Sequence, residues 1–498
     1  MKLNYKIIFH FFGLLLLFNG SFILLATLLS YCYKDGATLE LLHSAISVLF
    51  IGVIMMLCTK NHTKEINKRE GYLVVTFGWI VMTLSGTLPY LFTGSIPNFS
   101  NAIFETISGY TTTGSTILND VEVLPKGVLF WRSLTHWIGG MGIIVLAIAI
   151  LPLLGIGGMQ LFAAEAPGLS ADKLHPRITD TAKRLWLIYF GYTLAETVLL
   201  YLAGMTFFEA INHSMSTLST GGFSTKNISI SYWNDNPMIQ YIIVIFMFLA
   251  GTNFVLSYFV FKGKVFKIIQ DEEFKLYCKF IIIFTLIVAG IVYYNSHLTD
   301  SITFYHPMVL GELEASIRHS FFQVVAIVTT TGFVTANYTI WSPFLLVFFF
   351  GLMFLGGSAG STSGGVKVVR HLVLIKNGFL EFKRTLHPSA ILPLRYNNKS
   401  VSGQIVFNVL GFFILYMLSF IVGSLGFALL GLDFESSIGV AASSLGNVGP
   451  ALGNFGPANS FIEMPTLGKW WAAFLMLIGR LELFTVLIIF TPFFWRNR

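Results

Sequence analysis

Four short segments of an otherwise apolar chain combine glycine with hydroxyl or amide side chains. They read TTTGST at 111–116, STGGFST at 219–225, TTTGFVT at 329–335 and GNVGPAL at 446–452. A dehydrated cation needs oxygen ligands in place of its water, and backbone carbonyls that point inward together can supply them. Glycine permits the φ and ψ values this needs and leaves no Cβ in the lumen, while hydroxyls can hold non-helical backbone or add ligands. The segments therefore predict a cation selectivity filter.

The four segments recur in register. Their central glycines, Gly114, Gly222, Gly332 and Gly449, are 108, 110 and 117 residues apart, and small residues stand twelve and six positions before each. The positions fifteen before are Phe99, Phe207, Ile317 and Phe434. Small-residue packing notches are common in membrane helices, but a notch does not require this fourfold recurrence. The candidate filter residues are Thr112, Thr113, Gly114, Thr220, Gly221, Gly222, Thr330, Thr331, Gly332, Asn447, Val448 and Gly449.

Composition indicates the elements that must position this filter. Of the 498 residues, 55% are hydrophobic and 11% charged, against roughly 25% charged in soluble domains. This indicates an all-α polytopic membrane protein, in which a spanning helix needs about 20 apolar residues. Ten such runs lie near 7–31, 40–58, 72–93, 128–154, 184–205, 238–261, 277–294, 344–375, 404–430 and 470–495. The first run has no A-x-A cleavage site, so it is interpreted as a span rather than a signal peptide.

Shorter semi-polar runs lie near 99–113, 207–221, 315–331 and 434–448, and each ends within a filter segment. They are too short to cross a bilayer and fit re-entrant helices, whose negative C-terminal ends would favour a cation. Each lies between two spans, so we expect four helix–pore-loop–helix units around a central pore, after two extra N-terminal helices. The expected division is 1–71, 72–183 (repeat 1), 184–276 (repeat 2), 277–403 (repeat 3) and 404–498 (repeat 4).

Lysine and arginine indicate the orientation. If the N-terminus is cytoplasmic, the inner segments hold 24 of the 31 basic residues. The positive-inside rule then places both termini in the cytoplasm and the four filter segments toward the outer side. The net charge of +7 reports this orientation, and we expect lipid rather than nucleic acid as the partner.

A second glycine-rich segment interrupts the third repeat. FLLVFFFGLMFL at 344–355 gives about 18 Å of helix, roughly half a bilayer, before GGSAGSTSGG at 356–365. Such a segment at mid-membrane must line a cavity or be covered by protein. A gate is one interpretation, a static broken helix another, and a phosphate-binding loop is disfavoured because no G-x-x-x-x-G-K-[ST] follows. The candidate gate residues are Gly356, Gly357, Ser358, Ala359, Gly360, Ser361, Thr362, Ser363, Gly364, Gly365 and Arg480.

Buried charges raise further alternatives. Arg480 lies about ten residues into the last predicted span, where a guanidinium is costly unless it meets water or a partner. It could pair with Glu482 or Glu105, or place a positive charge in the pore cavity that limits flux. Arg132 lies nearer the outer surface and is expected to reach it by snorkelling. Lys367 and Arg370 are expected to mark the inner interface, and the basic segment 376–399 could dock a partner or simply report topology.

The four filter segments, together with GGSAGSTSGGVKVVR at 356–370, GRLELFT at 479–485 and LHPRITDTAKRLWLIY at 174–189, resemble the Trk/Ktr/HKT superfamily of potassium transporters. The resemblance to its bacterial TrkH-type pore subunits covers essentially the whole chain. It implies a pseudo-fourfold pore and a homodimer in the bacterial inner membrane. It also implies a cytoplasmic TrkA-type partner that carries the nucleotide, so no organic cofactor is expected in this chain.

The resemblance also implies roles for particular residues. Glycine at all four filter positions implies potassium as the permeant ion. The segment 356–365 is implied to be an intramembrane gating loop, and Arg480 a charge in the cavity. The fourth filter segment departs from the threonine pattern, with Asn447 and Pro450 around its glycine.

Two other functions remain as alternatives. A secondary transporter that couples potassium to a proton or sodium ion would use intramembrane carboxylates, for which Glu105, Glu196, Glu209 and Glu482 are candidates. An enzyme would need a cluster of acid, base and nucleophile. His136 and His213 occur singly, without H-E-x-x-H or G-x-S-x-G, so the chain is not expected to be an enzyme.

Overall fold

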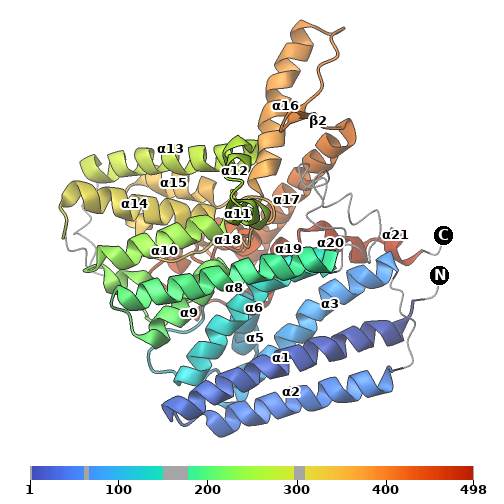
Figure 1. Cartoon of the computed structure of the whole chain (residues 1–498), viewed down its shortest axis with the longest axis vertical. Coiled ribbons are helices and arrows are strands. Elements are labelled where there is room, and N and C mark those ends of the chain that lie inside the picture. The colour runs from blue at the N-terminus through green and yellow to red at the C-terminus, as the bar shows by residue number, and fades with distance from the viewer. Residues whose placement is uncertain (1–2, 61–66, 150–177, 296–308, 497–498) are drawn as a thin grey trace.

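The computed structural model describes residues 3–60, 67–149, 178–295 and 309–496 (Figure 1). Within these ranges the regular secondary structure is helical apart from a two-stranded antiparallel hairpin, β1 (Arg395–Tyr396) and β2 (Lys399–Ser400). The predicted inner segment 156–183, which contains the boundary between the first two repeats, lies largely outside the described residues, as does part of the 174–189 motif.

Each predicted span contains a described helix. Six are long and apolar enough to cross a membrane. They are α1 (Tyr5–Tyr33), α2 (Thr38–Cys58), α3 with α4 (Lys68–Gly86, Leu88–Phe92), α8 (Ile178–Leu202), α13 (Glu272–Asn295) and α17 (Gly403–Leu429). The remaining spans contain α6 (Lys126–Ala149), α10 with α11 (Pro237–Ala250, Phe254–Phe261), α15 with α16 (Pro343–Leu352, Val368–Leu386) and α19 with α20 and η5 (Thr466–Arg480, Phe484–Leu487, Ile488–Phe490). Shorter helical pieces are η1 (Ser229–Trp233), α12 (Phe266–Gln270), η3 (Tyr338–Ile340), η4 (Gly453–Phe455) and α21 (Pro492–Trp495).

Two spans that were predicted as continuous are sharply bent. The axes of α10 and α11 differ by 105°, and those of α19 and the following helical piece by 110°. At the first break, backbone groups that a straight helix would satisfy bond instead to the segment 356–365. The Ser358 N–H donates to Gly251 O at 2.9 Å, and the Phe254 N–H donates to Gly360 O at 3.2 Å. An insertion from another repeat therefore accompanies this break, and a periodicity argument does not detect it.

The semi-polar runs form short helices as predicted. They are α5 (Phe99–Tyr110), α9 (Phe207–Leu218), α14 (Glu312–Val328) and α18 (Phe434–Gly446). Three begin at the recurring phenylalanine because the preceding Asn98, Thr206 and Asp433 side chains accept hydrogen bonds from the first turn. The third helix begins earlier than predicted, at Glu312, where Glu312 and Glu314 lie in its first turn. Acidic residues there suit the positive end of the helix dipole.

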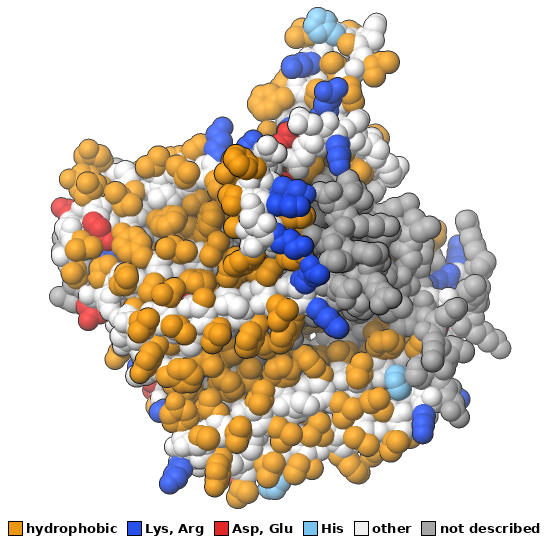
Figure 2. All heavy atoms as spheres, viewed as in Figure 1, with side chains coloured by type: hydrophobic (Ala, Val, Ile, Leu, Met, Phe, Trp, Pro, Cys, Tyr) orange, Lys and Arg blue, Asp and Glu red, His pale blue; other side chains and the backbone are white. Residues whose placement is uncertain are grey.

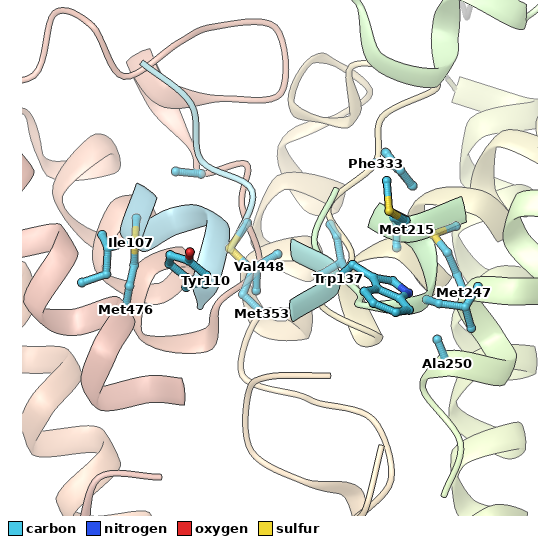
Figure 3. Close-up of a cluster of buried hydrophobic side chains, with 14 of the residues drawn as sticks. Ile107, Tyr110, Trp137, Met215, Met247, Ala250, Phe333, Met353, Val448 and Met476 are labelled. Atoms are coloured by element: carbon cyan, nitrogen blue, oxygen red, sulfur yellow. The ribbon is translucent and has the colours of Figure 1, made fainter. Parts of the chain in front are cut away.

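Most residues of the four short helices are buried. Apolar side chains pack around their C-terminal ends, where Figure 3 shows Tyr110 with Met476 on one side and Met215 with Met247 on the other. The two N-terminal helices α1 and α2 pack against each other at one side (Figure 1). The Tyr110 hydroxyl donates to the buried Asn19 at 2.5 Å, which links α1 to α5.

The outside of the molecule is apolar over the flanks of its long helices. Figure 2 shows hydrophobic side chains spread along the flanks of α1, α2 and α8, and a row of lysine and arginine side chains between α8 and the base of α16. This is the pattern of a multi-pass membrane protein. Helix α16 and the β1–β2 hairpin project away from the rest (Figure 1), since α16 continues to Leu386, past the predicted end at residue 375.

Candidate functional site

The four short helices end in the same unusual backbone turn. Thr112, Thr220, Thr330 and Asn447 have φ of 51°, 55°, 57° and 54°, a left-handed conformation that is rare for a β-branched residue. The next residue donates its N–H to the carbonyl five positions back, as a Schellman cap requires. These bonds are Thr113–Ser108 (2.9 Å), Gly221–Ser216 (2.8 Å), Thr331–Ala326 (2.8 Å) and Val448–Ser443 (2.9 Å). The small residues six positions before each filter glycine thus lie at the cap.

The filter glycines form a closed ring. Gly114, Gly222, Gly332 and Gly449 have φ of 83°, 81°, 72° and 104°. A Cβ at each would come closer than 3.0 Å to a carbonyl oxygen of the next repeat, a distance that real Cβ atoms do not reach. The oxygens met in turn belong to Gly221, Thr331, Val448 and Thr113. The contacts run from the first repeat to the fourth and back to the first, so the predicted filter segments lie together around one axis.

A polar cavity of about 420 Å³ opens on one side of this ring. All four filter glycines line it, with residues that follow them, including Ser115, Ser224 and Val334. Amide and hydroxyl side chains such as Asn119, Asn227, Asn454 and Ser460 line the rest. A hydrated cation could therefore reach the ring from this vestibule.

The segment 356–365 packs against the other side of the ring, on residues that precede the glycines. The Gly364 N–H donates to Thr330 Oγ1 at 2.7 Å, and Thr362 Oγ1 donates to Leu218 O at 2.9 Å. A Cβ on Gly364 would collide with Gly446 O. Except for the exposed Gly360 and the half-buried Gly365, the segment is buried. It thus touches the ends of three of the four short helices and leaves no room for larger side chains at Gly364.

Glu273, which sequence reasoning missed, connects this segment to the start of α16. Its Oε1 accepts the N–H of Ala359 at 2.7 Å and the N–H of Val369 at 3.1 Å. The glutamate lies four residues before the predicted start of its span at 277, and its only sequence signal is an acidic group at a span boundary.

Lys367 and Arg370, which were expected to mark the inner interface, contact other parts of the chain. Both are buried. The Lys367 ammonium donates to Ser363 O, and Arg370 forms a 2.8 Å ion pair with Glu482 while its guanidinium lies 3.6 Å from the Phe412 ring centre. These cations therefore fix the C-terminal side of the segment 356–365 within the protein.

Arg480 lies beside the same segment. Its two terminal nitrogens donate to Thr362 O at 2.8 Å and to Gly139 O at 3.2 Å, and its side chain is 3% exposed. The two carboxylates considered as its partners, Glu105 and Glu482, form ion pairs with Arg132 and Arg370. The guanidinium thus joins the segment 356–365 to α6 through backbone carbonyls.

Arg132 does not snorkel to the surface. It is 3% exposed, and its Nε donates to Glu105 at 2.7 Å. Its Nη1 donates to Ser224 O at 2.9 Å, and its guanidinium lies 3.6 Å from the Phe223 ring centre. The side chain therefore bridges Glu105 on α5 and the segment that follows the second filter glycine.

The carboxylates considered for ion coupling differ in their partners. Glu209 caps α9 and lies 3.3 Å from the Lys226 ammonium. Glu196, on α8, is fully buried and has no ion pair with any residue in the described part of the chain. Of the four candidates, Glu196 is the one whose charge has no such partner.

Comparisons with known proteins agree with this geometry. Residues 39–497 match the TrkH family model, described as a cation transport protein. The chain is 40% identical to the Trk system potassium uptake proteins TrkH of Salmonella typhimurium and Escherichia coli K12, over 99% of this chain and 100% of each relative. It is also similar to the crystal structure of the potassium transporter TrkH from Vibrio parahaemolyticus, with a TM-score of 0.88, 37% identity, and 99% and 100% of the two chains covered. The chain therefore belongs to the TrkH family of cation transport proteins.

Proposed function

We propose that the protein is a potassium uptake pore of the bacterial cytoplasmic membrane, and that Thr112–Gly114, Thr220–Gly222, Thr330–Gly332 and Asn447–Gly449 form its selectivity filter. The observation that carries this is the closed ring in which each filter glycine faces a backbone carbonyl of the next repeat. Such carbonyls can replace the hydration shell of a cation. The assignment of potassium as the permeant ion rests on the names of the relatives.

We further assign the chain five parts, 1–71, 72–183, 184–276, 277–403 and 404–498, of which the last four are the pore repeats. Both termini are cytoplasmic in this proposal. The N-terminal part of α1 and the C-terminal helical pieces share one cluster with Leu73 and Val74, which supports a common side. Entry is then from the outer vestibule.

The segment 356–365 is proposed as the gate. It is buried against the ring on the side away from the vestibule, and Thr362 is held there by Leu218 O and Arg480. Because Arg480 adds a positive charge at this point, it opposes a cation that has passed the filter. A movement of the segment would break these hydrogen bonds and, at the same time, open the pore for the ion.

A cytoplasmic TrkA-type subunit that carries the nucleotide is proposed as the regulator, and a second copy of this chain as the dimer partner. Support comes from α16, which projects from the molecule (Figure 1). Ile375, Phe379, Phe382 and Leu386 lie on one face of it and are 43%, 66%, 71% and 75% exposed. An apolar stripe outside the main body is typical of an interaction surface.

Coupled transport is the second candidate function, and Glu196 is the observation that favours it. A carboxyl group buried without an ion pair is costly when charged, so it is the group best suited to carry a proton. Coupling predicts that uptake follows a proton gradient as well as the potassium gradient.

The test is rubidium uptake into proteoliposomes that contain the purified chain, with and without the regulator. Potassium, sodium and lithium compete, and the membrane potential is set independently of the proton gradient. A potassium-selective pore gives uptake that potassium blocks, that sodium does not, and that follows the electrochemical gradient of the permeant ion alone. Equal block by sodium would overturn the ion assignment, and uptake that needs a proton gradient would establish coupling.

A further inference from the structure

The residue nine positions before the filter glycine is polar and fully buried in three repeats. These residues are Glu105, His213 and Gln323, on α5, α9 and α14. Each bonds to the chain two or three positions after the filter glycine of its own repeat. In each of these repeats the bond thus joins the short helix to the chain beyond the filter glycine.

The contacts are specific in each repeat. In the first, Glu105 Oε2 accepts the Ile117 N–H at 2.9 Å, and Thr116 Oγ1 donates to the same carboxylate at 3.0 Å. In the second, His213 Nε2 lies 2.9 Å from Ser224 Oγ. In the third, the Gln323 Nε2 donates to Thr335 Oγ1 at 3.2 Å.

The fourth repeat is held differently. Its matching residue is Val440, which is buried and apolar. Instead, the carbonyl of Gly449 accepts hydrogen bonds from Ser443 Oγ at 2.8 Å and from Ser115 Oγ of the first repeat at 2.9 Å. A brace from the minus-nine position is therefore a property of three repeats.

We propose that Glu105, His213 and Gln323 are positioning residues that set the width of the selectivity filter. Each fixes the outer end of a segment whose inner end is already fixed by the Schellman cap. A filter segment held at both ends cannot close around a smaller ion, so the brace favours potassium over sodium. Arg132 extends the first brace to the second repeat, because it contacts both Glu105 and Ser224 O.

This inference rests on the proposed potassium pore, and Gln323 offers the cleanest test because its removal leaves no buried charge. We expect Gln323→Leu to weaken the preference for potassium over sodium in rubidium uptake by about fivefold, as the loss of one buried hydrogen bond allows. Gln323→His places the residue of the second repeat at this position and should retain the preference. Val440→Ala is the matched control, since it alters packing at the same position without removing a hydrogen bond.

The readouts separate positioning from packing. Thr335→Val removes the hydroxyl that bonds to both Gln323 and His319 and should shift the preference at least as far as Gln323→Leu does, which keeps the test open if Gln323→Leu does not fold. Lower thermal stability with an unchanged ion preference in Gln323→Leu or Thr335→Val would overturn the inference. An equal shift in Val440→Ala would also overturn it. A wild-type protein without potassium preference would instead remove the proposed function itself.

Discussion

At the scale of single residues, three repeats carry threonine where a left-handed helix cap usually has glycine or asparagine. Asn447 is the usual residue, and Thr112, Thr220 and Thr330 are the exceptions. Backbone strain of this kind costs about 1–3 kcal/mol per residue. Thr330 Oγ1 accepts the Gly364 N–H, and Asn447 Nδ2 donates to Thr113 Oγ1 at 3.0 Å. Two of the four left-handed residues, Thr330 and Asn447, thus connect the proposed filter to the proposed gate and to the neighbouring repeat.

We predict that Gly114→Ser lowers the preference for potassium over sodium by about tenfold, a loss of about 1.4 kcal/mol. The added Cβ would meet the carbonyl oxygen of Gly221 in the next repeat, so the ring must open at this point. Competition of sodium with rubidium uptake measures the change. Gly94→Ser is the control, because Gly94 also has a positive φ, of 67°, but has nothing within 4 Å of a Cβ. Unchanged competition in Gly114→Ser would remove the glycine from the filter.

The sequence predicted which residues meet at the proposed filter, but not which charges pair. The proposed filter could be predicted from the sequence because glycines, hydroxyls and small cap residues recur at fixed spacing. The partners of Arg480 could not be predicted, because they are the backbone carbonyls of Thr362 and Gly139, and every residue has a backbone carbonyl. Glu105 was considered as a partner of Arg480 but forms its ion pair with Arg132. Which arginine it pairs with depends on how α5 packs against α6.

At the scale of elements, the helix that was predicted to break does so, and the inserted segment bonds to the backbone at a second break, between α10 and α11. The segment between α15 and α16 enters the gap between α10 and α11. Local composition predicted the first break, since no helix is stable over five glycines in ten residues. It could not predict the 105° bend, because α10 and α11 are apolar and their broken backbone is satisfied by a segment about a hundred positions away.

Shortening this segment is predicted to open the pore. The Gly356 N–H donates to Val366 O at 2.9 Å, so the two ends of the segment are joined by a hydrogen bond. Residues 359–362 can therefore be removed without separating these ends. The deletion eliminates the Thr362 contacts to Leu218 O and Arg480. We expect rubidium uptake without the regulator to rise about tenfold, equivalent to about 1.4 kcal/mol of lost closed-state stability.

Thr362→Ser is the control for this deletion, because it keeps both the hydroxyl and the carbonyl and should leave uptake low. A deletion variant that elutes as a folded protein and is as closed as the wild type would show that the segment only packs. Circular dichroism and size-exclusion chromatography establish folding before transport is compared.

At the scale of the whole molecule, a pseudo-fourfold ring is embedded in an asymmetric body. The two helices α1 and α2 stand beside the first repeat, and only the third repeat, within the described residues, extends an intramembrane segment and a projecting helix (Figure 1). Glu273 connects these two extensions, because it bonds to both Ala359 and Val369. Its neighbour Glu272 pairs with Lys376 on α16 at 2.6 Å and accepts the Asn397 N–H of the hairpin at 3.0 Å. A force on the projection can therefore reach the proposed gate over a short, bonded path.

The apolar face of this projection leads to the last prediction. Phe379 and Phe382 are 66% and 71% exposed, and burying two such rings is worth about 1.5–3 kcal/mol each. We expect the protein in mild detergent to be a dimer by light scattering, and Phe379→Asp with Phe382→Asp to convert it to a monomer without loss of helix. Val123→Asp is the control, since Val123 is 74% exposed in the segment before α6 and far from α16 in sequence. A wild-type monomer, or a double variant that stays dimeric, would show that this face of α16 is not the dimer interface. Binding of the regulator to the same variants would then test whether the regulator contacts this face.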